Sequence, residues 1–191
     1  MHYQVNQKWR GIVNNVQLKG GDILLRPYEI KDAEQTFMAA KESIAEVSPW
    51  MPWCHTNYTI EESISWIELC AKSWNDGIAY GFAITDSKNG SLIGGCGLNK
   101  INDIDKVANL GYWVRSSRVK HGIATTATLL LSDFGFKQLN LNRIEILVAI
   151  ENKASQRVAV KAGAMREGLL RNRLLLYGKI HEAVMFSLIP R

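Results

Sequence analysis

The segment from Leu110 to Thr125, LGYWVRSSRVKHGIAT, runs from an apolar strand through a basic loop into the start of a helix. Gly122 lies at the turn, where a residue without a side chain lets the backbone approach a bulky group. The unpaired N–H groups at a helix start and the positive end of the helix dipole both attract phosphate. The segment therefore predicts a cradle for a pyrophosphate, although such a loop by itself also suits an ordinary solvent-exposed turn.

A second polar segment, Asn152-Lys153-Ala154-Ser155, follows further along the chain. Asn152 is typical of a helix N-cap, and Gly163 is typical of the residue that ends the same helix. Ser155 then falls in the first helical turn. Asn and Ser are common at helix starts for structural reasons alone, so their chemistry depends on how close the fold brings them to the Gly122 loop.

Strands and helices alternate along the chain and must position both segments. Runs of strand-forming residues predict strands at 23–27, 79–85, 91–98, 107–114, 143–150, 169–176 and 179–189. Apolar stripes at helical spacing predict helices at 30–44, 60–74 and 123–136, and a shorter one from the Asn152 cap to Gly163. Thr59 and Glu62 form a capping box. This order indicates one mixed β-sheet with helices on both faces, an α/β fold, or α+β by some conventions.

Length and composition indicate one folded domain. The 191 residues are 47% hydrophobic and 21% charged, which is ordinary for a globular protein. We expect the domain to span residues 22–191, with residues 1–21 forming an arm or an extra strand. Three cysteines without CxxC spacing predict neither a disulfide framework nor a metal site, and no apolar run is long enough to span a membrane. A cytoplasmic location is the expectation.

The formal net charge of +5 and the isoelectric point near 9.1 predict a partner with negative charge. Nucleic acid, anionic lipid and a phosphorylated cofactor all satisfy this condition. The basic residues are scattered rather than gathered in a block, which argues against a nucleic-acid-binding tail. We therefore expect no direct contact with nucleic acid and no membrane partner.

Four segments, in this order and spacing, resemble the GNAT superfamily of acyl-CoA-dependent N-acetyltransferases. Within it they are most similar to the RimJ/RimL branch, which acetylates the N-termini of ribosomal proteins. The segments are LLRPYEIKDAE, PWMPW, LGYWVRSSRVKHGIATTA and IENKASQRVAVKAGAMREGLLRN, and the resemblance covers residues 22–190. It implies a single GNAT-like domain that uses acetyl-CoA as co-substrate and needs no metal.

The resemblance also implies roles for individual residues. The loop at 120–125 would hold the pyrophosphate of acetyl-CoA, and the strand before it would hold the pantetheine arm. The cofactor-binding residues implied are Trp113, Val114, Arg115, Lys120, His121, Gly122, Ile123, Ala124, Thr125, Asn152 and Ser155. The acceptor groove is implied at Trp50, Trp53 and Tyr112. Both tryptophans also suit an apolar plug between two helices.

Two positions depart from the family pattern. Val119 stands where relatives carry Gln or Arg, and Asn109 stands where relatives often carry Glu. The first change is expected to weaken rather than abolish pyrophosphate binding, because most contacts in such a loop come from the main chain. The second removes a carboxylate base. Glu145 on the following strand is the alternative base, although it also suits an exposed strand position.

Attack on a thioester needs a neutral amine, and the departing thiolate, with a pKa of about 8.5, benefits from a proton donor. Ser155 is the expected donor, and a backbone N–H near Val114 is expected to hold the oxyanion. An α-amine has a pKa of about 7.7 to 8.0 and lysine one of about 10.4. A site without an evident base therefore suits direct acetyl transfer to the N-terminal α-amine of a ribosomal or other protein.

Two other functions stay open. The loop at residues 48–53, SPWMPW, is called the tryptophan loop below. An acidic pocket for a small amine, such as an aminoglycoside or a polyamine, could form near it from Glu42, Glu46, Glu61 and Glu62. A non-catalytic protein that binds CoA or RNA is the third hypothesis, suggested by Asn109, Val119 and the positive charge. Acceptor identity and the existence of a homodimer are left open by the sequence.

Overall fold

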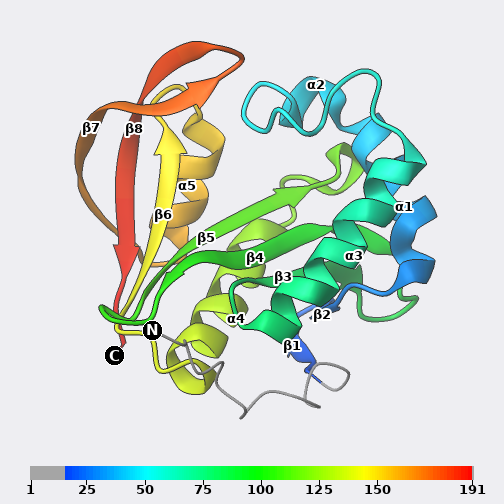
Figure 1. The fold of residues 1–191 in the computed structure, drawn as a ribbon, viewed down its shortest axis with the longest axis horizontal. Helices are drawn as coiled ribbons and strands as arrows, with labels where there is room; N and C mark the ends of the chain where they lie inside the picture. The colour runs from blue at the N-terminus through cyan, green and yellow to red at the C-terminus, as the bar shows by residue number, and fades with distance from the viewer. Residues whose placement is uncertain (1–15, 191) are drawn as a thin grey trace.

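Residues 16–190, which the computed structural model describes, form a single eight-stranded sheet in the order β1-β2-β3-β4-β5-β6-β8-β7 (Figure 1). The strands are β1 (Leu18–Gly20), β2 (Ile23–Pro27), β3 (Tyr80–Asp86), β4 (Leu92–Asn102), β5 (Val107–Val114), β6 (Arg143–Ala149), β7 (Met165–Leu176) and β8 (Lys179–Leu188). Neighbouring strands are antiparallel except β5 and β6, which are parallel. The sheet is therefore mixed, as the sequence predicts.

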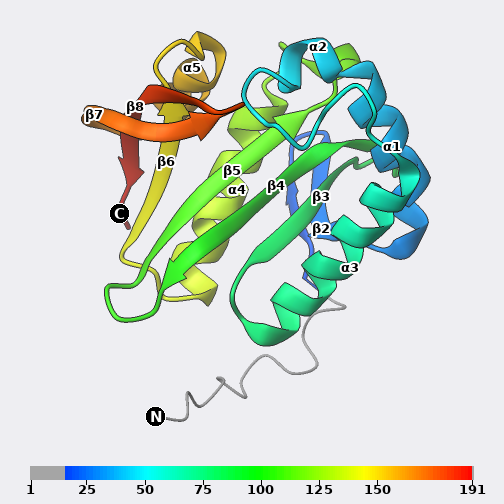
Figure 2. The same ribbon diagram turned by 45° about the horizontal axis from the view of Figure 1, so that its top comes forward.

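Helices cover both faces of this sheet (Figures 1 and 2). The helical segments are η3 (Ile30–Asp32), α1 (Ala33–Glu42), α2 (Ile44–Val47), α3 (Ile60–Asp76), η4 (Ser116–Arg118), α4 (Ile123–Gln138) and α5 (Lys153–Lys161). On one face α1 packs against β4 and α3 packs against β3. On the other face α4 packs against β4 and β5, beside α5. The α/β fold with helices on both faces is confirmed.

Strand β3 shows how alternation builds two apolar layers. Phe82 and Ile84 belong to the main core cluster with Leu131 of α4. Ala83, between them, belongs to a second cluster with Ile67 of α3. Successive strand residues point to opposite faces, so one strand supplies both cores. The sheet becomes a rigid platform, and the segments that follow β5 and β6 are positioned by it.

Strands β5 and β6 separate soon after they meet (Figure 1). They pair only where Val107–Asn109 run beside Arg143–Glu145. Beyond that point β5 stays paired with β4 alone, up to Val114. The Arg115 N–H donates to the Ile93 carbonyl of β4 at 2.8 Å, and backbone direction alternates along a strand, so the N–H groups of Tyr112 and Val114 face the gap. The gap is therefore bordered by free main-chain donors and acceptors.

The glycines of β4 bring β5 and a tryptophan close to the sheet. A Cβ on Gly94 would lie 2.2 Å from the Trp113 carbonyl oxygen, and a Cβ on Gly95 would lie 2.8 Å from Trp113 Nε1. Both distances are too short for any side chain to fit without movement. The run Gly94-Gly95 is therefore needed so that Trp113 can lie against the sheet beside the gap.

The single helix expected over 30–44 is divided in the structure. Ser43 lies at the break between α1 and α2, with φ −109° and ψ 7°. Its buried hydroxyl donates to the Ala39 carbonyl at 2.6 Å and accepts from the Ser116 N–H at 3.0 Å. The break therefore ties the end of α1 to the loop after β5, a long-range contact that helical spacing does not reveal.

Other boundaries differ less from expectation. Strand β7 starts at Met165 rather than at residue 169, because Met165 and Arg166 already pair with β8. Residues 18–20 form β1 against β2, whereas residues 1–15 of the expected arm or extra strand lie outside the described part of the chain. All three cysteines are buried and free. None of the helices described is long and apolar enough to cross a membrane.

Candidate active site

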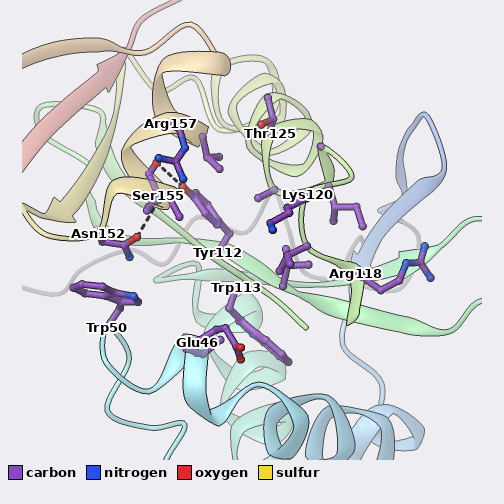
Figure 3. Close-up of a pocket in the computed structure, with 18 of the residues that line it drawn as sticks. Glu46, Trp50, Tyr112, Trp113, Arg118, Lys120, Thr125, Asn152, Ser155 and Arg157 are labelled. Atoms are coloured by element: carbon purple, nitrogen blue, oxygen red, sulfur yellow. Dashed lines mark hydrogen bonds between the residues drawn. The ribbon is translucent and has the colours of Figure 1, made fainter. Parts of the chain in front are cut away.

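The gap between β5 and β6 opens into a cavity of about 530 Å³ (Figure 3). Its walls come from β5 with the first turn of α4, from α5, and from α2 with the loop after it. The expected site residues that line it are Trp50, Tyr112, Trp113, Val114, Lys120, Gly122, Ile123, Ala124, Thr125, Asn152 and Ser155. Four other expected residues do not line it, namely Trp53, Arg115, His121 and Glu145.

The first turn of α4 forms one end of the cavity. Gly122 caps the helix with φ 76°, a left-handed conformation that suits glycine, and no atom lies within 4 Å of where its Cβ would be. The first hydrogen bond of α4 is donated by Thr126 to the Gly122 carbonyl at 3.0 Å, so the three preceding N–H groups have no acceptor within the helix. Together with the exposed Lys120 they fit a phosphate-bearing ligand.

The basic loop before α4 is fixed by a carboxylate of α1. Arg115 makes a two-point ion pair with Glu42, its Nε lying 3.1 Å from Oε1. The N–H and hydroxyl of Ser117 donate to the same oxygen at 3.0 and 2.7 Å. The Arg115 guanidinium is the main cause that lowers the pKa of Glu42 to about 2. Arg115 therefore positions the loop, and we assign it no direct contact with the ligand.

The Ser155 and Tyr112 hydroxyls meet inside the cavity, 2.8 Å apart (Figure 3). Tyr112 Oη also lies 3.1 Å from the Ser155 carbonyl oxygen, and Asn152 Oδ1 accepts from the Ser155 N–H at 3.0 Å. Burial raises the pKa of Tyr112 to about 12, so this phenol keeps its proton at neutral pH. When Tyr112 donates to Ser155 Oγ, the serine proton is free to point into the cavity.

For the acetyl transfer that the resemblance to the GNAT superfamily implies, replacing Tyr112 with phenylalanine is expected to lower kcat by about tenfold, because one hydrogen bond that orients Ser155 is lost. The KM for acetyl-CoA should change much less, since the phenyl ring still fills the same wall. Tyr58→Phe is the matched control: its buried hydroxyl hydrogen-bonds Ser63 at 3.0 Å, away from the cavity. Steady-state kinetics that show equal losses in both variants would assign the effect to folding instead.

Glu145 is not brought to the cavity. Its carboxylate accepts from Arg143 Nε at 3.0 Å, and the same guanidinium also pairs with Glu167. Glu145 lies at the closed end of the β5–β6 pair, beside Asn109, whose side-chain amide donates to Asn99 at 3.0 Å. We therefore do not carry Glu145 forward as a base.

The wall opposite α5 comes from α2 and the tryptophan loop. Trp50 lines the cavity, whereas Trp53 packs edge-on against Trp113, with ring centroids 5.3 Å apart, and supports that wall from behind. The tip of the β7–β8 hairpin reaches the same loop (Figure 2). There the Tyr177 hydroxyl donates to the Ser48 carbonyl at 2.7 Å, which joins the two halves of the molecule across the gap.

Sequence reasoning missed several lining residues. Arg157, Val158 and Lys161 of α5 line the cavity, as does Met51, whereas Glu46, which also lines it, was expected only as part of an acidic pocket. The sequence did contain a signal for the α5 residues. Arg157 and Val158 follow Ala154 by three and four positions, and Lys161 follows Arg157 by four, so all of them lie on one face of the helix.

The net positive charge of the chain comes from residues 151–191, which include α5, β7 and β8. Residues 1–150 contain 15 basic and 15 acidic side chains, and residues 151–191 contain 8 basic and 3 acidic ones. The whole formal excess of +5 therefore comes from the segment that begins just before α5.

Comparisons with known proteins point to one family. A family model described as "Acetyltransferase (GNAT) domain" matches residues 22–165. The N-acetyltransferase p20 of Bacillus licheniformis is 32% identical over 170 residues, which are 88% of this chain and 93% of that protein. The ribosomal-protein-serine acetyltransferase of Escherichia coli (strain K12) is 28% identical over 102 residues, 53% of this chain and 57% of that protein.

Solved structures show the same fold. RimJ of Mycobacterium smegmatis, determined in complex with CoA-disulfide, superposes with a TM-score of 0.82 at 25% identity, over 91% of this chain and 86% of that one. The family match covers most of the chain and includes β5, the Gly122 loop and α5. The chain therefore belongs to the GNAT family of acetyltransferases.

Proposed function

We propose that this GNAT protein transfers the acetyl group of acetyl-CoA to the α-amino group of a protein N-terminus. The observation that carries the choice of acceptor is the charge around the cavity. Among the described residues that line it, Glu46 is the sole carboxylate, while the cations are Lys120, Arg157, Lys161 and Arg118, the last of which is paired with Asp86 at 3.0 Å. Such a lining favours a polyanionic donor and an acceptor with a single positive charge, and it opposes a polycation.

The acidic pocket considered for small polyamines has little support. Glu42 is held by Arg115 and Ser117, and Glu62 accepts from the Thr59 N–H at 2.9 Å and lies 3.0 Å from His55 Nε2. Neither of these carboxylates lines the cavity. Glu46 accepts from the Ser116 hydroxyl at 2.5 Å through Oε2 and has no cationic partner among the ion pairs of residues 16–190, so its charge can match one ammonium group.

The proton balance also favours an α-amine. Near pH 7 the neutral fraction of an α-amine exceeds that of a lysine side chain by about 300-fold, given their pKa values. Within residues 16–190 no histidine lines the cavity, and Glu46 is the one lining carboxylate that could accept a proton. An amine that is already partly neutral needs least help from such a site.

The reaction then follows from the positions of the side chains. The amine nitrogen attacks the thioester carbon, the C–S bond breaks, and the amine gives up one proton. The Val114 N–H, which faces the gap, would hold the oxyanion of the tetrahedral intermediate. Ser155 would donate its proton to the departing CoA thiolate, with Tyr112 orienting it, and would regain a proton from the one that the amine gives up, so that the products are the amide and the CoA thiol. The name of the ribosomal-protein-serine acetyltransferase relative supports a protein acceptor.

Replacing Glu46 with glutamine is expected to raise the KM for an N-terminal peptide by about tenfold, because the ammonium form loses its charged partner. The KM for acetyl-CoA should stay near the wild-type value. Glu34→Gln, on the exposed side of α1, is the matched control for the loss of one negative charge. Initial rates measured while each substrate is varied in turn separate the two constants, and a larger effect on acetyl-CoA than on peptide would contradict this role.

An acceptor panel tests the proposed function. CoA thiol release is measured with peptides bearing a free N-terminus, with Nα-blocked peptides containing lysine, with spermidine and with an aminoglycoside. The free N-terminal peptides should give the highest kcat/KM. Higher kcat/KM with spermidine or the aminoglycoside would assign the enzyme to small amines, and binding of acetyl-CoA without turnover of any amine would indicate a non-catalytic protein.

A further inference from the structure

A second cavity, of about 470 Å³, lies beside the first and shares two residues with it. The shared residues are Arg157 and Lys161, four positions apart on α5, so they form part of the wall between the two cavities. In Figure 3 Arg157 lies across the upper part of the first cavity from Thr125 of α4. The first turn of α4 and this pair of cations therefore face a common space.

The second cavity is strongly cationic. Lys153, Arg157, Lys161 and Arg166 line it together with Gln156, Val160 and Phe186, and no carboxylate from the described part of the chain does. Within residues 16–190, no ion pair joins any of these four cations to an acidic side chain. Lys153 turns its ammonium group to the Ile150 carbonyl at 2.8 Å. Arg157 and Lys161 thus remain available to an anion that reaches the shared wall.

The chemical structure of acetyl-CoA identifies an anion suited to the wall formed by Arg157 and Lys161. In acetyl-CoA the ribose that follows the pyrophosphate carries a separate 3′-phosphate, a monoester with a charge of about −1.5 to −2 at neutral pH. Helix α5 packs beside α4 and presents Arg157 and Lys161 to the same cavity as the first turn of α4, where the pyrophosphate is expected. A guanidinium fork and an ammonium group are the usual partners of a phosphate monoester.

We propose that Arg157 and Lys161 bind the 3′-phosphate of acetyl-CoA and make the enzyme discriminate against dephospho-CoA. The inference rests on acetyl-CoA being the donor, as the proposed function states, and adds a subsite that selects the donor. The pair acts on the far end of the cofactor and takes no part in the chemistry at Ser155.

Calorimetric titration with CoA and with dephospho-CoA tests the subsite directly, without any amine acceptor. The wild-type protein should bind CoA about thirtyfold more tightly than dephospho-CoA, because two charge-assisted contacts are lost with the phosphate. In Arg157→Gln/Lys161→Gln this preference should fall to within about threefold of unity, mainly through weaker binding of CoA. Lys153→Gln, which removes a neighbouring cation that lines only the second cavity, should keep most of the wild-type preference.

Competition adds a second readout. Adenosine 3′,5′-bisphosphate should compete with CoA for the wild-type protein far better than 5′-ADP, and the double variant should lose this difference. Equal affinity of the wild-type protein for CoA and dephospho-CoA would overturn the subsite, and so would a preference that survives in the double variant. Failure to bind CoA at all would instead overturn the proposed function, so the two failures can be told apart.

Discussion

Replacing Ser155 with alanine is expected to lower kcat by about 100-fold, the low end of what a positioned proton donor contributes. The hydroxyl hydrogen-bonds Tyr112 at 2.8 Å, and the backbone that carries it is fixed by the Asn152 cap at 3.0 Å. Alanine keeps this backbone and removes only the donor, so the KM for acetyl-CoA should change little. Thiol release at saturating acetyl-CoA and peptide measures the loss.

Ser132→Ala is the matched control for the Ser155 variant. Ser132 is buried on α4, and its hydroxyl donates to the Leu129 carbonyl at 2.9 Å, outside the cavity. A loss of kcat that is similar in both variants would point to stability, and thermal unfolding of each protein checks this. If Ser155→Ala keeps wild-type kcat, the thiolate leaves without a proton from this residue.

The second large effect is expected at Gly122, from the comparison of Gly122→Asp with Gly122→Asn. Both residues tolerate the left-handed φ of 76° better than other side chains do, and both have open space at the Cβ. They differ by one negative charge at the start of α4, where the pyrophosphate is expected. Repulsion over a few ångströms should raise the KM for acetyl-CoA in the aspartate variant by about tenfold or more relative to the asparagine variant.

The asparagine variant isolates the strain from the charge in this experiment. Its KM relative to the wild-type value reports the cost of a side chain in the loop, and the ratio of the two variants reports electrostatics alone. High salt should shrink that ratio, because ions screen an exposed charge. Identical KM values for both variants would place the pyrophosphate away from the first turn of α4.

Local signals in the sequence predicted most of the elements. The capping box of Thr59 and Glu62 is present, with the Thr59 N–H donating to Glu62 at 2.9 Å, and α4 begins at Ile123 as its apolar stripe predicts. Such features depend on residues within one or two turns of each other, so they can be read from a single sequence. The mixed sheet followed from the order of these elements.

Contacts between distant parts of the chain could not be read in the same way. At the break in the first helix, the Ser43 hydroxyl accepts a hydrogen bond from the Ser116 N–H. At the tip of the β7–β8 hairpin, Tyr177 hydrogen-bonds Ser48, which lies 129 residues away in the sequence. The position of Glu145 relative to the gap depends on where β5 and β6 diverge, which no local pattern specifies. Helical spacing could have added Arg157 and Lys161 to the site, but their relation to the Gly122 loop needed the fold.

The uneven charge of the chain affects how a donor first meets the enzyme. The whole formal excess of +5 lies in residues 151–191, and four basic side chains of this segment, Lys153, Arg157, Lys161 and Arg166, line one cavity beside α5, which favours a positive potential there. A diffusing polyanion turns in such a field before it makes contact, so its phosphates arrive first and its uncharged end follows. If acetyl-CoA binds as proposed above, its nucleotide reaches α5 first, and its acetyl group then moves along β5 to Ser155. Encounter by this route is fastest in dilute salt, and each increase in ionic strength slows it.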